Sequence, residues 1–210
     1  MIIQLFPGEH QNSEFDGGYI ISPLTAGPVL IKNSDDKWII VDPGSFSHKE
    51  KLISELAFHG LVPADIDAVL NTHHHLDHTS NNFIFSDYCP IFTRSAILWP
   101  NGKTYIYKDH DMHRVEWPSD IELLHTPGHT FDHVSFVYKW EGKTYVCAGD
   151  AVREDMIRDE SEVTAQHPGP YLESLKSIFE IADVIFPGHG RVIDGDLLEE
   201  LKLLVDDKQS

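Results

Sequence analysis

The chain has 210 residues, of which 41% are hydrophobic and 24% charged, and its 34 acidic and 16 basic side chains give a formal net charge of −18. This composition excludes a disordered chain, and the length suits one domain that spans residues 1–210. The negative charge argues against a protein whose main role is to hold nucleic acid, because that binding needs cations to displace counterions.

The start of the chain and its cysteines favour a cytoplasmic protein. The first nine residues lack a basic segment, and their apolar run ends at Pro7. No window approaches the about 18 apolar residues of a membrane span. Cys89 and Cys147 form no Cys-x-x-Cys pair, so we expect neither a disulfide framework nor a cysteine zinc site. We expect no membrane contact.

Short apolar runs in the first half of the chain predict strands joined by turns. The runs cover residues 18–21, 29–32, 38–41 and 66–70. Before the last run, apolar residues at helical spacing predict a helix from Leu52 onward that ends at Gly60. Ser47 and Glu50 fit a capping box at the start of this helix.

The second half of the chain also alternates strands with helices. Short strands are predicted within residues 91–107, at 121–124 and at 184–185, and a hairpin is predicted from 134–138 and 143–147. Residues 171–182 and 197–204 carry leucines and other apolar residues on one helical face. These segments predict amphipathic helices that cover a sheet.

The most informative stretch is the histidine-rich segment that follows the run at 66–70. If its backbone stays extended, His73, His75 and Asp77 point to one side, and a turn at Asp77 brings His78 toward a second position nearby. Two imidazoles and a carboxylate that converge suit a divalent cation such as zinc. The segment therefore predicts a metal site.

Three later segments each place one further ligand-type residue just beyond a predicted strand. His129, Asp150 and His189 each stand beside glycines that allow a tight turn of the backbone. The repeated arrangement favours one shared metal cluster over three independent loops.

Together these residues resemble the metallo-β-lactamase superfamily of metal-dependent hydrolases. The motif His-x-His-x-Asp-His occurs at residues 73–78 and is followed in the superfamily's order by His129, Asp150 and His189, with a weaker match at residues 41–44. The resemblance implies the α/β (α+β) class and a four-layer αββα sandwich, in which two mixed β-sheets carry helices on their outer faces.

The resemblance also implies a dinuclear centre. The implied ligands are His73, His75 and His129 for one ion, Asp77, His78 and His189 for the other, and Asp150 as a bridge between both. The expected ions are two Zn²⁺, with iron or manganese as alternatives. Two such ions produce a bridging hydroxide at neutral pH. Asp77 is the predicted catalytic residue, which orients this hydroxide and carries a proton to the leaving group. The antibiotic-degrading lactamases lack an aspartate bridge, so Asp150 points to the wider hydrolase branch.

Three reactions stay open. The chain's small size and acidic surface favour a hydrolase of a small-molecule ester, thioester or lactone. A phosphodiesterase or ribonuclease is the second hypothesis, because residues 125–133, 147–153 and 182–189 weakly resemble the sub-family of metallo-β-lactamase domain-containing protein 1, which is linked to RNA cleavage. Nucleic acid is disfavoured by the net charge. The third is a mononuclear iron persulfide dioxygenase, which shares the fold and the motif. For the oligomeric state, which is separate from the reaction, a homodimer is an alternative to a single chain.

Several other residues carry weaker signals. His74 is expected to point away from the metals, and His133 either supports a ligand or lies at the surface. Residues 109–113 suggest an acidic loop at the pocket rim.

The loop after Asp150 and the turn at Asp42 complete the candidates. Arg153, Met156 and Arg158 either receive an anionic or amphiphilic substrate or form a solvated charged turn. Asp42 is expected to be a supporting carboxylate rather than a ligand.

Overall fold

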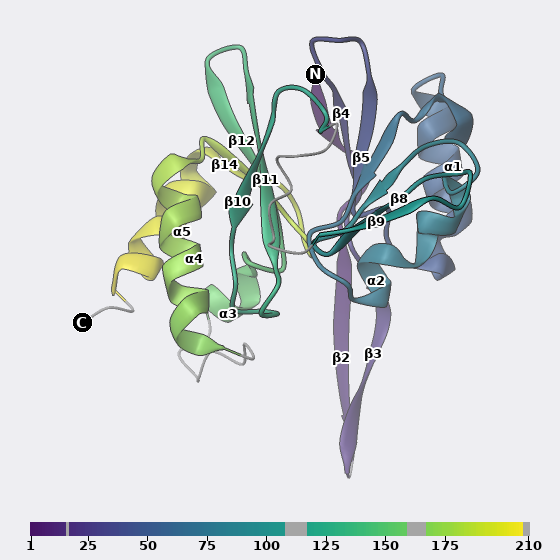
Figure 1. Cartoon of the computed structure of the whole chain (residues 1–210). Helices are drawn as coiled ribbons and strands as arrows, with labels where there is room; N and C mark the ends of the chain where they lie inside the picture. The colour runs from purple at the N-terminus through teal and green to yellow at the C-terminus, as the bar shows by residue number, and fades with distance from the viewer. Residues whose placement is uncertain (16, 108–116, 159–166, 208–210) are drawn as a thin grey trace.

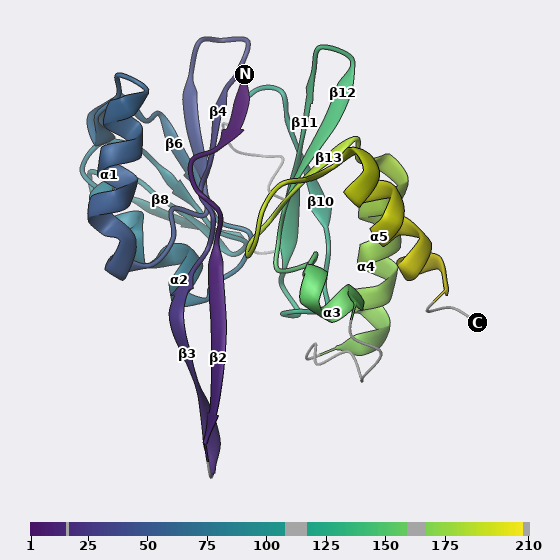
Figure 2. The same ribbon diagram turned by 180° about the vertical axis from the view of Figure 1, so that it is seen from behind.

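The computed structural model describes residues 1–15, 17–107, 117–158 and 167–207. Two mixed β-sheets face each other at the centre, with α1 outside one sheet and α4 and α5 outside the other (Figures 1 and 2). This arrangement confirms the expected four-layer α/β sandwich. The segment at 109–113 lies outside the described residues.

The first sheet has seven strands in the order β1-β4-β5-β6-β7-β8-β9. Its strands are β1 (Ile2–Gln4), β4 (Val29–Lys32), β5 (Trp38–Val41), β6 (Ala68–Leu70), β7 (Ile91–Phe92), β8 (Ala96–Leu98) and β9 (Thr104–Ile106). The central strands β5, β6 and β7 run parallel, whereas the outer pairs are antiparallel. Both faces of β5 and β6 are covered, which is why these strands are continuous apolar runs.

The second sheet has five strands in the order β10-β11-β12-β13-β14. Its strands are β10 (Ile121–His125), β11 (Val134–Trp140), β12 (Lys143–Gly149), β13 (Val184–Pro187) and β14 (Ile193–Asp194). β10, β11 and β12 are antiparallel neighbours, and β12 pairs parallel with β13. Consequently β10, β12 and β13 run in the same direction and end at the same edge of the sheet.

The helices are α1 (Lys49–Phe58), α2 (Leu76–Thr79), α3 (Glu154–Arg158), α4 (Pro168–Ile181) and α5 (Gly195–Asp207), with short 3-10 turns η1 (Phe46–His48), η2 (Pro63–Asp65) and η3 (Ser80–Ile84). The long helices α1, α4 and α5 correspond to the three that the apolar spacing predicts. None of the helices in the described ranges is long and apolar enough to cross a membrane.

Three apolar clusters hold the layers together. The central cluster lies between the sheets and includes Leu70 and Phe136. A second cluster packs α1 against the first sheet through Leu56, and a third packs α4 and α5 against the second sheet through Ile178 and Leu201. Each of these side chains is at most 1% exposed, so the burial that the sequence pattern predicts for the helices is realised.

The expected capping box at the start of α1 is wrong. Ser45, not Ser47, begins the helical region: its hydroxyl accepts from Ser47 N at 3.4 Å, and its carbonyl accepts from His48 N at 2.9 Å. The turn at Gly44, which has a φ of 87°, sends the chain into η1 before α1 begins. The expected end at Gly60 is confirmed, because α1 stops at Phe58 and Gly60 has a φ of 74°.

A long hairpin of β2 (Glu9–Phe15) and β3 (Gly18–Thr25) extends from the body (Figure 1). The sequence indicates only its second strand, at residues 18–21. β2 has no alternation of apolar and polar residues: it pairs with β3 in a separate two-stranded sheet, and none of its described residues belongs to an apolar cluster. The first residues of β2 bring Glu9 and His10 to the end of the molecule where the parallel strands finish.

Candidate metal centre

The candidate ligands sit on loops that leave the carboxyl ends of strands in both sheets. The segment at 73–78 follows β6, His129 follows β10, Asp150 follows β12 and His189 follows β13. β5 and β6 are parallel in one sheet, and β10, β12 and β13 share one direction in the other. The facing sheets therefore deliver all these loops to one end of the sandwich.

The motif segment does not stay extended, so the expected alternation of His73, His75 and Asp77 along a strand is wrong. Helix α2 begins at Leu76, and its first turn closes when His78 N donates to His75 O at 3.1 Å. Backbone bonds from other loops hold this turn, since Asp77 O accepts from Ala26 N at 2.9 Å. A helical turn thus brings Asp77 and His78 into the site.

The first ligand group consists of three nearly perpendicular imidazoles. The ligand atoms of His73, His75 and His129 all lie within 4.8 Å of one another. His129 Nε2 is 3.0 Å from His75 Nδ1, and the His73 ring is 4.5 Å from that of His75 and 4.8 Å from that of His129. These nitrogens surround one small volume.

The second group combines a carboxylate with two imidazoles. Asp77 Oδ2 lies 3.4 Å from His78 Nε2 and 3.3 Å from His189 Nε2. The two rings are 5.5 Å apart at an angle of 89°. His78 is fully buried and His189 nearly so, so this group is screened from solvent.

Asp150 joins the two groups. Its Oδ2 is 3.4 Å from His129 Nε2 in the first group, whereas its Oδ1 is 3.3 Å from His78 Nε2 and 3.4 Å from His189 Nε2 in the second. One carboxylate oxygen therefore faces each group.

Hydrogen bonds behind the rings fix which nitrogen faces the site. His78 Nδ1 donates to Asp42 Oδ2 at 2.9 Å, and His189 Nδ1 donates to the Glu9 carbonyl at 3.2 Å. The Thr72 hydroxyl donates to Asp42 at 2.6 Å and so accepts from His73 Nδ1 at 3.1 Å. Because all three Nδ1 atoms carry protons, the Nε2 lone pairs face the site. Asp42 thus supports the site from behind, as expected.

Glycine at position 188 allows this close assembly. A Cβ built on Gly188 would overlap Asp150 Oδ1 and stand 2.8 Å from His78 Cε1. Likewise, a Cβ on Gly149 would overlap Thr72 Oγ1. These glycines permit backbone to approach the carboxylate and the rings.

The residues present fit a pair of divalent cations. Among the described side chains, His73 Nε2, His78 Nε2 and Asp150 Oδ1 are buried and have no hydrogen-bond partner. Unpartnered buried polar atoms are costly, and a cation that accepts their lone pairs removes this cost. Imidazole nitrogens with carboxylate oxygens form the donor set that zinc and similar ions prefer.

The electrostatics of the two groups differ. Burial lowers the pKa of His73 well below its ordinary value and that of His129 to about 4, so these rings are neutral. Burial also opposes a proton on His189, but Asp150 overcomes it and raises the pKa of His189 to about 9. Despite its own burial, Asp150 has a pKa well below the usual range because His189 and His78 lie beside it. A cation bound at the second group would displace protons from its rings.

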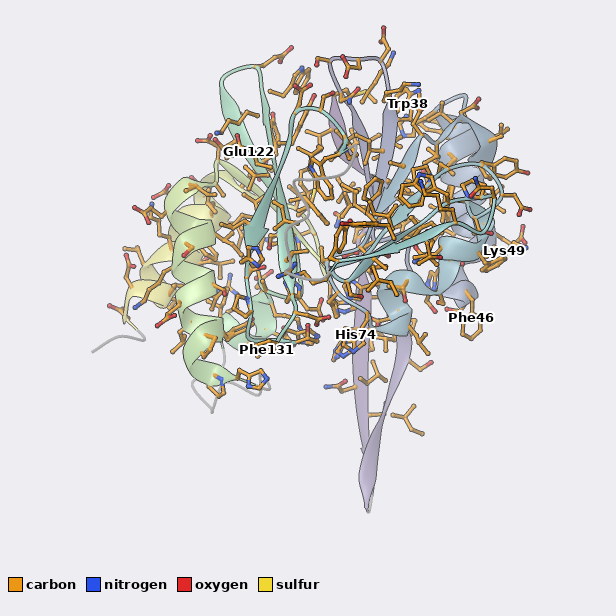
Figure 3. The ribbon with its side chains drawn as sticks, in the orientation of Figure 1. Trp38, Phe46, Lys49, His74, Glu122 and Phe131 are labelled. Carbon is orange, nitrogen blue, oxygen red and sulfur yellow. The ribbon has the colours of Figure 1, made fainter. Side chains whose placement is uncertain are left out.

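Two further histidines lie close to the ligands. His74 is exposed, as expected, and its Nδ1 lies 3.6 Å from Asp132 Oδ1; Figure 3 labels His74 and Phe131 at the bottom of the two-sheet body, above the tip of the β2–β3 hairpin. His133 is not at the surface: it is 1% exposed, and its ring stacks 5.0 Å from that of His73. Its Nδ1 bonds with Thr126 Oγ1 at 2.9 Å. Burial lowers the pKa of His133 to about 3, so it packs as a neutral ring behind a ligand.

The charged residues after Asp150 take two different positions. Arg153 is largely buried, and its Nη1 is 4.0 Å from Asp150 Oδ2. Arg158 instead forms ion pairs with Glu154 at 2.7 Å and Glu200 at 2.6 Å, neither of which is a candidate ligand. The solvated-turn interpretation thus fits Arg158 but not Arg153.

Two residues that touch the cluster are absent from the predicted site residues, and only one of them had a clue in the sequence. The His10 ring lies 5.2 Å from that of His189, and Thr72 links His73 to Asp42. His10 belongs to β2, whose contact with the site depends on tertiary structure. Thr72 does lie inside the motif segment, where its hydroxyl beside a ligand histidine was the available clue.

Comparisons with known proteins agree with this geometry. The sequence profile of the metallo-beta-lactamase superfamily matches residues 28–96. Metallo-beta-lactamase domain-containing protein 1 of Xenopus laevis is 33% identical over 159 residues, which cover 72% of this chain and 66% of that protein. The protein MJ0296 of Methanocaldococcus jannaschii, described as a probable metallo-hydrolase, is 31% identical over 74% of this chain and 72% of its own length.

Solved structures share the fold. The Thermotoga maritima protein tm0894 superposes with a TM-score of 0.62 at 20% identity, covering 92% of this chain and 98% of its own. A quorum-quenching N-acyl homoserine lactone lactonase gives 0.59 at 20% identity over 90% of each chain.

Fold and site define a metal-dependent hydrolase. The chain belongs to the metallo-beta-lactamase superfamily.

Proposed function

We propose that this protein is a dinuclear hydrolase that acts on a small ester, thioester or lactone. The observation that carries the proposal is the position of Asp150, whose two oxygens face two complete ligand groups. His73, His75 and His129 would hold one divalent cation, and Asp77, His78 and His189 the other. Zinc is the proposed metal, with iron or manganese as alternatives.

The chain's own residues have separate roles in this reaction. When bound, two cations polarise the scissile carbonyl and lower the pKa of a water near them. Asp77 contacts the imidazoles through Oδ2, so Oδ1 is the atom that we propose to accept the proton of the attacking water. The same atom then delivers the proton to the leaving oxygen or sulfur. Asp42 and Thr72 keep the rings of His78 and His73 oriented.

Two observations support the proposed substrate class: the fold that this chain shares with a lactonase, and the negative net charge of this chain. The fold matches that of a lactonase over 90% of both chains. The net charge of −18 disfavours long polyanions, which is why we place a phosphodiesterase or ribonuclease second. A single-iron dioxygenase, which shares the motif, is placed third because it would use one ion where the two ligand groups offer places for two.

Counting metal ions per chain tests the dinuclear site. Protein purified without a His tag or added metal, then saturated with zinc and dialysed against metal-free buffer, should hold two ions by plasma mass spectrometry. His189→Asn should hold one, because only the second group loses a ligand. His59→Asn is the matched control, since His59 is exposed at the end of α1 and should leave two ions.

Hydrolytic activity is then measured on the same preparations. Hydrolysis of thioester and lactone substrates should require metal and disappear after chelation. One iron per chain with oxygen uptake on persulfides, or cleavage of phosphodiesters alone, would contradict the proposal.

A further inference from the structure

The N-terminal strand β1 leaves one edge of the seven-stranded sheet unpaired. β1 is the last strand in the order and, among the described strands, pairs only with β4. Alternate residues bond to this neighbour: Met1 O accepts from Lys32 N at 2.8 Å, and Leu5 N donates to the chain just before β4 at 2.9 Å. In an antiparallel pair, the residues between them point their N–H and C=O groups the other way. The main-chain groups of Ile2 and Gln4 therefore face away from β4.

A groove of about 530 Å³ runs along this free edge. It is lined by residues 2–7 on one side and by Phe186, Arg191 and Val192 on the other. Ile2 and Phe186 belong to the central apolar cluster, and Val192 packs against that cluster. In Figure 2 the strand that begins at N runs down the face of the molecule between the two sheets. The groove thus lies over the rim of the central core.

β1 lacks the features that usually protect the edge of a sheet. Its residues, Ile2–Gln4, include no charged side chain and no proline. β14, an edge of the other sheet, contains Asp194 and continues directly into α5 at Gly195. An extended segment that adds to β1 would gain main-chain hydrogen bonds from the edge and apolar contacts from the groove.

Arg191 supplies the one charged side chain in the lining of the groove. Gln4 Nε2 donates to Gly190 O at 3.3 Å, which places Arg191 next to the Gln4 end of β1. Arg191 is exposed, and among the described residues it forms no ion pair. An acidic side chain on the incoming segment would complement this cation. A second copy of this chain fits less well, because a twofold contact brings the same positive patch of two proteins of net charge −18 together.

We propose that the free edge of β1 is a docking site for an extended segment of a partner protein, which adds to the sheet as a further strand. The segment carries apolar residues at alternate positions, which face the groove, and an acidic residue beside Arg191. This inference does not rest on the proposed hydrolysis.

A labelled synthetic peptide tests the site on the zinc-loaded protein. The probe alternates valine and threonine, carries a glutamate at each end, and should bind saturably by fluorescence anisotropy with one peptide per chain. Methylation of the amide nitrogens along one edge of the peptide should abolish binding, because only one edge pairs with β1. Methylation along the opposite edge should change Kd less than about threefold. Absence of saturable binding up to about 1 mM, or equal effects of both methylation patterns, would overturn the proposal.

A proline at position 4 tests the same edge from the side of the protein. Gln4→Pro removes the N–H that faces the groove without removing a bond to β4, so Kd for the probe should rise at least about 10-fold. Gln4→Ala is the matched control, because it keeps this N–H and loses only the side-chain bond to Gly190. Zinc content and the urea midpoint establish that both variants are folded. If folded Gln4→Pro binds the probe as well as Gln4→Ala does, strand addition is refuted; if Gln4→Pro does not fold, the methylated peptides decide.

The charge on the groove is tested separately. Arg191→Gln should weaken the glutamate probe by about two- to fivefold, the range of an exposed ion pair, and should leave a probe with glutamines at its ends unchanged. Lys139→Gln is the matched control, because Lys139 is exposed and does not line the groove. Equal effects of Arg191→Gln on both probes would contradict the acidic preference. A dimer that light scattering detects and that the probe dissociates would assign the edge to a second copy and overturn the proposal.

Discussion

Replacing Gly188 by alanine tests how closely the backbone approaches the metal ligands. The new Cβ would overlap Asp150 Oδ1 and stand 2.8 Å from His78 Cε1 and 3.1 Å from Gly149 C. All three neighbours are held by the cluster or by the main chain, so the overlap is relieved only by moving the Asp150 carboxylate or the loop after β13.

The size of the effect follows from this steric conflict. Gly188 is not among the residues with positive φ, so alanine adds no backbone strain. Forcing a methyl group into a filled site costs about 1–3 kcal/mol. The free energy of unfolding should therefore fall by about that amount in urea titrations, and zinc content should fall below two ions per chain because Asp150 is displaced from both groups.

Gly169→Ala is the matched control, because a Cβ there has no atom of the described residues within 4 Å and the position lies in the first turn of α4. It should keep its metal, with a free energy of unfolding within about 1 kcal/mol of the unmodified protein. If Gly188→Ala were as stable and as metal-rich as Gly169→Ala, the described contact between position 188 and Asp150 would be refuted.

Three further predictions concern other parts of the site and core. Asp77→Asn keeps the side-chain shape but cannot take up a proton, so kcat should fall by roughly 10²- to 10⁴-fold. The control Asp132→Asn changes a carboxylate next to exposed His74 and should retain kcat. An equal loss of kcat in both variants would argue against proton transfer by Asp77. Asp42→Asn removes the charged acceptor of His78 Nδ1, so zinc affinity measured by competition with a chelator should drop about 10- to 100-fold, and unchanged affinity would contradict the supporting role of Asp42. Burial raises the pKa of Cys89 to about 12 and that of Cys147 still further, so both thiols stay protonated from pH 6 to 9. A colorimetric thiol reagent should therefore detect neither thiol until the protein unfolds. Rapid labelling of the folded protein at pH 8 would contradict the burial of these thiols.

Local sequence patterns were enough to predict much of the sandwich. The apolar runs at Val29–Lys32 and Trp38–Val41 coincide with β4 and β5, because a strand covered on both faces must be apolar throughout. Strand β2 lacks such a pattern, and none of its described residues belongs to an apolar cluster. Its role in the site, through Glu9 and His10, was therefore invisible along the chain.

The candidate ligands were likewise predictable, because their chemistry and their places after strands are sequence properties. Helix α2, in contrast, is set by backbone bonds from Ala26 and Gly44 to Asp77 and His78, residues distant in the chain. The sequence by itself determined which side chains are available to bind metal. Only the tertiary structure decided that Asp150 faces both groups and that Arg153, not Arg158, reaches them, because those positions depend on how loops from two separate sheets pack together.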